Sequence, residues 1–158
     1  MPPIRTDARV IRIENEEDMR VLAVRIAQIL KTGDVITLAG GLGAGKTVFA
    51  RALVNALAPS EEEVPSPTFT LVQVYDRQSP AIWHFDLYRL EKQSEVAELG
   101  WEEARREGVA VIEWPDRLGS LLPRDRLEIT IEFAPDSDAA RVVTFTPFGQ
   151  WIRRQKED

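Results

Sequence analysis

The sequence predicts an α/β fold, a single domain in which a mixed β-sheet is flanked by helices. The segment 34–39 is short, mostly apolar and rich in β-branched side chains, which is typical of a buried parallel strand. Glycines follow, and then Lys46–Leu57 shows a helical pattern. Strands and helices alternate early in the chain and strands dominate later, which favours a mixed sheet. The length of 158 residues, without internal repeats, suits one domain over 1–158.

The N-terminal part predicts an edge strand followed by an amphipathic helix. Val10–Glu14 alternates apolar and polar residues, as an edge strand does. From Met19 onward, apolar residues recur at helical spacing on one face. Asn15 is a suitable cap for the start of this helix, and Gly33 for its end.

The rest of the chain predicts a hairpin, a broken helix and a final antiparallel pair. An alternating pattern marks most of the strands, and an uninterrupted apolar run marks the buried one. The predicted elements are strands at Thr68–Tyr75 and Ala81–Leu87, two short helices within Gln93–Glu107 separated at Gly100, a buried strand at Val109–Ile112, and paired strands at Leu127–Phe133 and Arg141–Phe145.

Composition narrows the classes of function. There is no cysteine, which excludes disulfides and thiolate chemistry, and the single histidine, His84, excludes a multi-histidine metal site. No apolar run reaches the roughly 20 residues that span a bilayer, and Met1–Arg9 lacks a signal-peptide core. We therefore expect a cytoplasmic protein with no membrane contact.

The charge pattern bears on nucleic-acid binding. The net charge of −6 gives no overall attraction to nucleic acid. Basic residues in the C-terminal third are either a solvated surface or a local basic patch, and the first interpretation is the commoner one. These residues are Arg124, Arg126, Arg141, Arg153, Arg154 and Lys156.

One motif carries the main functional prediction. Residues 40–47 read Gly-Gly-Leu-Gly-Ala-Gly-Lys-Thr and match G-x-x-x-x-G-K-[ST], the P-loop. Glycines let backbone N–H groups approach phosphate oxygens, and the positive end of the following helix attracts the same anion. Lys46 supplies a charge to the β- and γ-phosphates, and Thr47 a hydroxyl ligand for Mg²⁺. We therefore predict binding of ATP with Mg²⁺ by Gly41, Leu42, Gly43, Ala44, Gly45, Lys46 and Thr47. A glycine-rich turn without a ligand is the alternative.

A P-loop needs a second carboxylate to hold Mg²⁺ or to position water, normally at the end of an apolar strand. Glu113 follows the apolar run at 109–112, and Asp86 ends the segment at 82–86. We expect both side chains near the γ-phosphate, although either alone is equally compatible with a surface position.

Two further segments are candidates for the site. Thr68, after Ser66-Pro67, is placed to contact Mg²⁺ or the γ-phosphate as a switch loop does, or simply to enter a strand. Trp114 either shields the metal from water or fills the core. Residues 116–119 match the D-x-x-G of GTPases, but no N-K-x-D motif accompanies them, so guanine recognition is discounted.

Together these blocks resemble the TsaE (YjeE) family of bacterial ATPases. The blocks that carry the resemblance cover roughly residues 10–145, and the third and fifth are far more specific than the P-loop. They are Gly41-Leu-Gly-Ala-Gly-Lys-Thr47, Ser66-Pro-Thr-Phe-Thr-Leu-Val72 with Tyr75, His84-Phe-Asp-Leu-Tyr-Arg89, Glu98-Leu-Gly100 and Ile112-Glu-Trp-Pro115.

The resemblance implies a role in making threonylcarbamoyladenosine in tRNA. Family members bind ATP and Mg²⁺, hydrolyse ATP slowly alone and act with the partners TsaB and TsaD, so any tRNA contact would be indirect through that complex. By the same resemblance, Thr47 and Glu113 would ligate Mg²⁺, Asp86 and Trp114 would support hydrolysis, and Ser66–Thr68 would sense the nucleotide. The family commonly has Asp where this chain has Gly41, which puts a role for that carboxylate in doubt here.

The sequence is also compatible with two other functions. A small-molecule kinase would use the same loop and would need an acceptor pocket and a lid, for which Asp116–Arg126 is the candidate stretch. A binding module that responds to nucleotide without hydrolysing it would also use the loop.

An arginine of the same chain, Arg89 or Arg141, is a further candidate for stabilising charge on the phosphates during hydrolysis.

Overall fold

The computed structural model describes residues 8–41, 43–57, 71–76 and 80–156, with the side chains of 155 and 156 not described. The elements within these residues are β1 (Arg9–Ile13), α1 (Glu16–Ala27), β2 (Val35–Ala39), α2 (Lys46–Leu57), β3 (Val72–Tyr75), β4 (Ala81–Asp86), α3 (Glu95–Glu98), α4 (Trp101–Glu107), β5 (Gly108–Glu113), the 3₁₀ helix η1 (Pro115–Leu121), β6 (Arg126–Phe133), β7 (Arg141–Phe148) and α5 (Gln150–Lys156).

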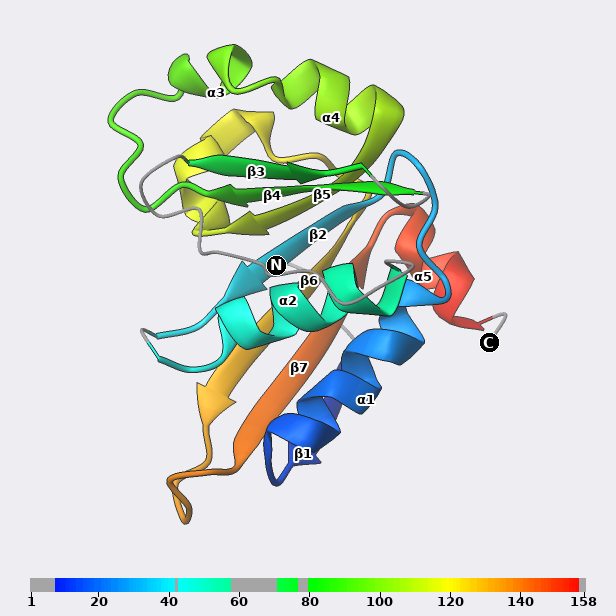
Figure 1. The fold of residues 1–158 in the computed structure, drawn as a ribbon, viewed down its shortest axis with the longest axis vertical. Helices are drawn as coiled ribbons and strands as arrows, with labels where there is room; N and C mark the ends of the chain where they lie inside the picture. Colours follow the sequence, from blue (N-terminus) through cyan, green and yellow to red (C-terminus); the bar gives the residue numbers. More distant parts are fainter. Residues whose placement is uncertain (1–7, 42, 58–70, 77–79, 157–158) are drawn as a thin grey trace, which may run out of the picture.

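The described strands form one seven-stranded mixed sheet in the order β1-β7-β6-β2-β5-β4-β3 (Figure 1). β2 lies at the centre and is parallel to both β5 and β6, while β4 is parallel to β5. The β6–β7 and β3–β4 pairs are antiparallel. The predicted α/β class, the edge position of β1 and both antiparallel pairs are confirmed.

Helices cover the two faces of the sheet in separate groups. α1 and α2 lie together on one face, as Figure 1 shows, and Phe49 and Leu53 of α2 pack there with Ile36 and Leu38 of β2. α3, α4 and η1 cover the other face over β4 and β5, where Trp101 packs with Phe85. β2 and β5 are therefore buried on both sides, which explains their continuous apolar sequences.

The described chain also differs from the sequence prediction at several element ends. α1 is capped as predicted, since the Asp18 N–H donates to Asn15 Oδ1 at 2.9 Å, but it ends at Ala27 rather than at Gly33. After Ala27 the helix tightens, because Leu30 N–H bonds to the Ala27 carbonyl three residues back. Gly33 takes its positive φ of 97° in the turn into β2 instead.

The C-terminal part contains more strand and helix than the sequence predicted. β7 continues to Phe148 and is followed by α5, whose Trp151 is buried in the core under α1 and α2. η1 was not predicted either; its Leu118 is fully buried, which ties the stretch proposed as a lid to the core. The break between α3 and α4 at Gly100, with φ 90°, is as predicted.

Candidate functional site

The glycine-rich loop joins the end of β2 to the start of α2. Gly40, Gly43 and Gly45 have positive φ angles of 142°, 78° and 118°, a region that side-chain-bearing residues rarely adopt. At Gly40 a Cβ would also overlap the carbonyl oxygen of Ile131 on β6. The loop therefore requires glycine at its first position for two independent reasons, backbone conformation and the close approach of β6.

Lys46 is the first residue of α2 and lies under the loop. Its Nζ donates to the Gly40 carbonyl at 2.9 Å and lies 4.0 Å from the centre of the Trp114 ring. Only 6% of Lys46 is exposed. Burial lowers the pKa of its ammonium below the ordinary 10.5, and the carboxylates of Glu113, Asp86 and Asp116 oppose this shift.

Both predicted carboxylates lie on the α2 side of the sheet and next to each other. Asp86 and Glu113 are opposite residues at the ends of the parallel strands β4 and β5. Both are buried, at 6% and 3% exposure. The negative charges of both carboxylates act on the Lys46 pKa, while their predicted position near the γ-phosphate stays a prediction.

Each carboxylate has a hydrogen-bond partner, a backbone N–H for Asp86 and a ring nitrogen for Glu113. Asp86 Oδ1 accepts a hydrogen bond from the Tyr88 backbone N–H at 3.1 Å. Glu113 Oε2 lies 2.7 Å from His84 Nε2 on β4. The Tyr88 ring contacts that of Trp114, with 4.9 Å between the ring centres.

Trp114 has an unusual backbone for a large side chain. Its φ of 59° and ψ of 54° are left-handed, and it precedes Pro115 at the start of η1. This turn places the ring against Lys46 and Tyr88, and the partly buried side chain also packs against the core cluster around Phe85 and Trp101. Left-handed backbone at a tryptophan is strained, and such strain concentrates at functional sites.

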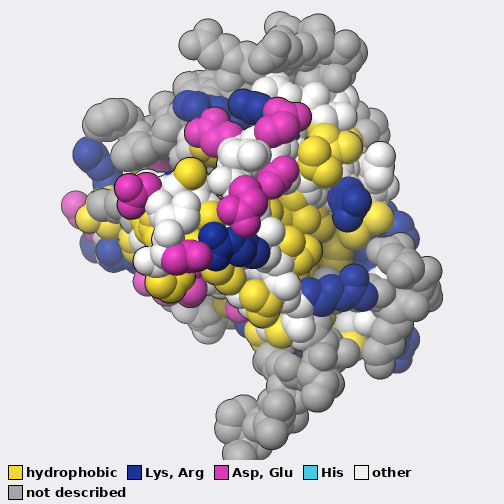
Figure 2. Space-filling model, turned by 90° about the horizontal axis from the view of Figure 1, so that it is seen from below, with side chains coloured by type: hydrophobic (Ala, Val, Ile, Leu, Met, Phe, Trp, Pro, Cys, Tyr) yellow, Lys and Arg dark blue, Asp and Glu magenta, His cyan; other side chains and the backbone are white. Residues whose placement is uncertain are grey.

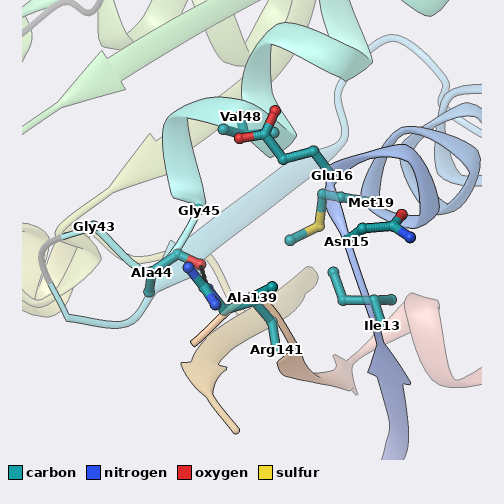
Figure 3. A pocket seen from close by; sticks show the side chains of 10 residues that line it. All are labelled: Ile13, Asn15, Glu16, Met19, Gly43, Ala44, Gly45, Val48, Ala139 and Arg141. Atoms are coloured by element: carbon teal, nitrogen blue, oxygen red, sulfur yellow. Dashed lines mark hydrogen bonds between the residues drawn. The ribbon is translucent and has the colours of Figure 1, made fainter. Parts of the chain in front are cut away.

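A small hollow of about 80 Å³ opens beside the loop, on the side of β1 and α1 (Figure 3). Ile13, Met19 and Val48 give it apolar walls, and Asn15 and Glu16 lie at its edge. Gly43, Ala44 and Gly45 of the P-loop form another wall. The hollow is smaller than the roughly 300–1,000 Å³ of pockets that enclose a whole small ligand, so its apolar walls and few polar groups suit one part of a ligand.

The other residues predicted for the site differ in exposure and contacts, and some lie outside the described residues. Thr47 is half-buried in the first turn of α2, and Gly41 is exposed, with open space where a Cβ would be. Leu42 and Ser66–Thr68 lie outside the described residues. Arg89 is exposed, whereas Arg141 is bonded through its Nε and Nη1 to carbonyl groups of the chain.

Two contacts in the site were not predicted from the sequence. One is the bond between His84 and Glu113, and the other is the bond from Arg141 to the carbonyl of Ala44 (Figure 3). A signal for the first was present: His84 and Asp86 are two residues apart on a strand and so share a face. The second joins residues 97 positions apart, and no local pattern indicates it.

Charge and hydropathy add two observations. None of the described helices combines the length and apolar character needed to cross a bilayer. On the face shown in Figure 2, acidic and basic side chains are interleaved with hydrophobic ones, so this face presents no continuous basic surface.

Comparisons with known proteins agree with the motifs. Residues 13–143 match the model of the family described as threonylcarbamoyl adenosine biosynthesis protein TsaE. The chain is 39% identical over 139 residues to the tRNA threonylcarbamoyladenosine biosynthesis protein TsaE of Bacillus subtilis, covering 87% of this chain and 85% of that one. It is 40% identical over 120 residues to the protein of the same name from Rickettsia felis, covering 76% and 70% of the two chains.

The fold is also similar to a solved one. The crystal structure of Bacillus subtilis YdiB superposes with a TM-score of 0.77 at 31% identity, covering 95% of this chain and 92% of that one. The family match spans most of the chain and includes the loop, both carboxylates and Trp114. The chain therefore belongs to the TsaE family.

Proposed function

We propose that this protein is an ATP- and Mg²⁺-binding P-loop ATPase that hydrolyses ATP slowly alone and supports threonylcarbamoyladenosine formation in tRNA with TsaB and TsaD partners. One observation carries the proposal. The buried Lys46 lies at the junction of glycine loop and helix, with Asp86 and Glu113 on the same face at the ends of the neighbouring strands. This set is what phosphoryl transfer requires, a phosphate cradle with a cation and carboxylates alongside.

The loop residues supply the binding of phosphate. Backbone N–H groups of Gly43–Lys46 would donate to phosphate oxygens, helped by the positive end of the α2 dipole. Lys46 would exchange its bond to the Gly40 carbonyl for one to a phosphate oxygen. That carbonyl and the Trp114 ring hold the ammonium beside the loop beforehand, which keeps its reorganisation small.

The donor set fits Mg²⁺. Among the described residues, no three acidic or histidine side chains are grouped to hold a metal unaided. Mg²⁺ suits such a site, because it is usually held by one or two carboxylates together with phosphates and water. Thr47 and Glu113 would ligate it, and when bound it would neutralise charge on the phosphates. Asp86 and Trp114 would orient and shield the attacking water.

Adenine would occupy the hollow beside the loop, since its apolar walls are next to the phosphate-binding backbone. Thr68 would sense the γ-phosphate. With a net charge of −6, the protein would act on tRNA through its partner complex rather than by direct contact.

Phosphate release from ATP and Mg²⁺, measured with the protein alone and then with TsaB and TsaD, tests this proposal. We expect slow release alone and faster release with partners. Release that is absent in both cases would point to a binding module. ATP-dependent phosphorylation of a small metabolite at more than about 1 s⁻¹, the rate of ordinary kinases, would instead indicate a kinase.

A further inference from the structure

His84 is a polar side chain in an apolar layer. It lies on β4 between Ile82 and Asp86 on the sheet face covered by α2, and its register partner on β5 is Val111. The side chain is fully buried. An aliphatic residue would satisfy this position by packing alone, because a buried polar group must recover the hydrogen bonds it loses to water.

Within the described part of the chain, only one of the two nitrogens of the His84 ring has a hydrogen-bond partner. Nε2 is bonded to Glu113 Oε2 at 2.7 Å, whereas the buried Nδ1 has no partner among the described residues. An ionised Glu113 only accepts hydrogen bonds, so Nε2 carries the proton of this bond. Apart from the bond to Glu113, this buried position therefore favours an aliphatic residue over histidine.

Glu113 depends on such a partner. Its side chain has three rotatable bonds, and the residue is 3% exposed. A buried carboxylate without a donor would rotate toward water or take up a proton. The imidazole ring is held by two packed strands, so it fixes one oxygen of Glu113 and with it the direction of the other.

We propose that His84 is a positioning residue, which holds Glu113 so that its second oxygen, Oε1, is directed to the Mg²⁺ of the bound nucleotide. The inference rests on the proposed function, because it assigns a partner to one of its metal ligands. His84 itself contacts neither the nucleotide nor the metal. Groups that orient metal ligands in this way typically contribute about 10- to 100-fold to metal affinity.

Two substitutions separate a positioning role from simple packing. The H84Q side chain would place an amide N–H near the position of Nε2, whereas the H84N side chain is shorter and would place its amide near the position of Nδ1. As a control for damage to the core, F85L alters a fully buried residue of the same strand that faces the other layer. Thermal melting of all three establishes which variants are folded.

The measurement is calorimetric titration of ADP into each folded variant, first in EDTA and then over a series of Mg²⁺ concentrations. We expect H84N to raise the Mg²⁺ concentration for half-maximal tightening about 10-fold or more, while ADP affinity in EDTA changes less than about threefold. H84Q should recover most of the Mg²⁺ response, and F85L should leave it unchanged. In a Glu113→Ala background, His84→Asn should have no further effect, because its target is gone.

Two results would overturn the inference: the same Mg²⁺ dependence in H84N as in wild type, or an equal loss of ADP affinity with and without Mg²⁺. If H84N does not fold, H84L takes its place, since an aliphatic side chain packs at this position but offers no donor: a reduced Mg²⁺ response in H84L that H84Q recovers supports the donor role, and a wild-type response in H84L contradicts it. Failure of the proposed function is distinguishable, because then the wild-type protein itself would show no Mg²⁺-dependent binding of ADP.

Discussion

Arg141 donates a hydrogen bond from Nε to the carbonyl oxygen of Ala44 at 2.9 Å and so ties the start of β7 to the phosphate loop. Its Nη1 bonds to the carbonyls of Asp138 and Ala140, and its guanidinium lies 4.2 Å from the centre of the Phe133 ring. These contacts use arginine's planar fork as a clamp, and a lysine could not reproduce them. The loop is thereby shaped from outside as well as by its glycines.

Replacing Arg141 by Ala should weaken nucleotide binding about fivefold, because a lost hydrogen bond costs about 1 kcal/mol and the loop gains freedom. Calorimetry with ATP and Mg²⁺ measures the effect. Arg126→Ala is a matched control, since that arginine also stacks on a phenylalanine, Phe148, but at the opposite end of the β6–β7 pair. Equal weakening in both variants would show a general loss of hairpin packing instead.

Substituting Gly40 should affect folding far more than substituting Gly41. Gly40→Ala combines a disfavoured φ with overlap on Ile131, so we expect a loss of at least about 2 kcal/mol in the free energy of unfolding. Gly41→Asp meets open space and should be nearly neutral. Denaturant unfolding of both variants checks this; comparable losses would contradict the described loop geometry.

The lowered pKa of Lys46 predicts a pH dependence of stability. Between the folded pKa and the ordinary value of 10.5, the unfolded chain binds more protons than the folded one, so stability rises with pH in that window. Relative to Lys46→Met, the free energy of unfolding of the wild type should therefore increase as the pH rises toward 10.5. Other groups titrate in both proteins and cancel in the difference. If the difference in free energy of unfolding between the two proteins stays constant or shrinks, burial does not dominate the pKa of Lys46.

Replacing Glu113 should separate hydrolysis from binding. Glu113→Gln keeps an oxygen for His84 but removes the charge, so we expect hydrolysis with Mg²⁺ to fall about 100-fold and nucleotide affinity in EDTA to change little. Phosphate release at saturating Mg²⁺ together with calorimetry gives both numbers. Undiminished hydrolysis would remove Glu113 from the metal site.

Local signals made much of the fold predictable. α2 begins at Lys46 and ends at Leu57, as its helical pattern predicted, and Gly100 separates two helices because its left-handed backbone ends the first. The sequence grouped Asp86 and Glu113 only through the needs of a P-loop; the structure brings them together because neighbouring parallel strands end at the same edge of a sheet.

Long-range contacts set the limit of that prediction. α1 stops at Ala27 although its apolar spacing continues, because the chain must turn to enter β2 and the spacing does not encode that turn. α5 spans only seven residues, too few for a clear helical period, and it is anchored by burial of Trp151. The contacts of His84 and Arg141 depend on strand register, which emerges only once the sheet is assembled.

Phosphate binding at residues 40–47 is best tested by calorimetric titration of ATP with Mg²⁺ into the wild type and Lys46→Ala. We predict a single site in the wild type and binding about 10- to 100-fold weaker in the variant, as expected for loss of a hydrogen bond to a charged group of about 1.5–3 kcal/mol. An unchanged dissociation constant in a folded Lys46→Ala protein would contradict phosphate binding at residues 40–47.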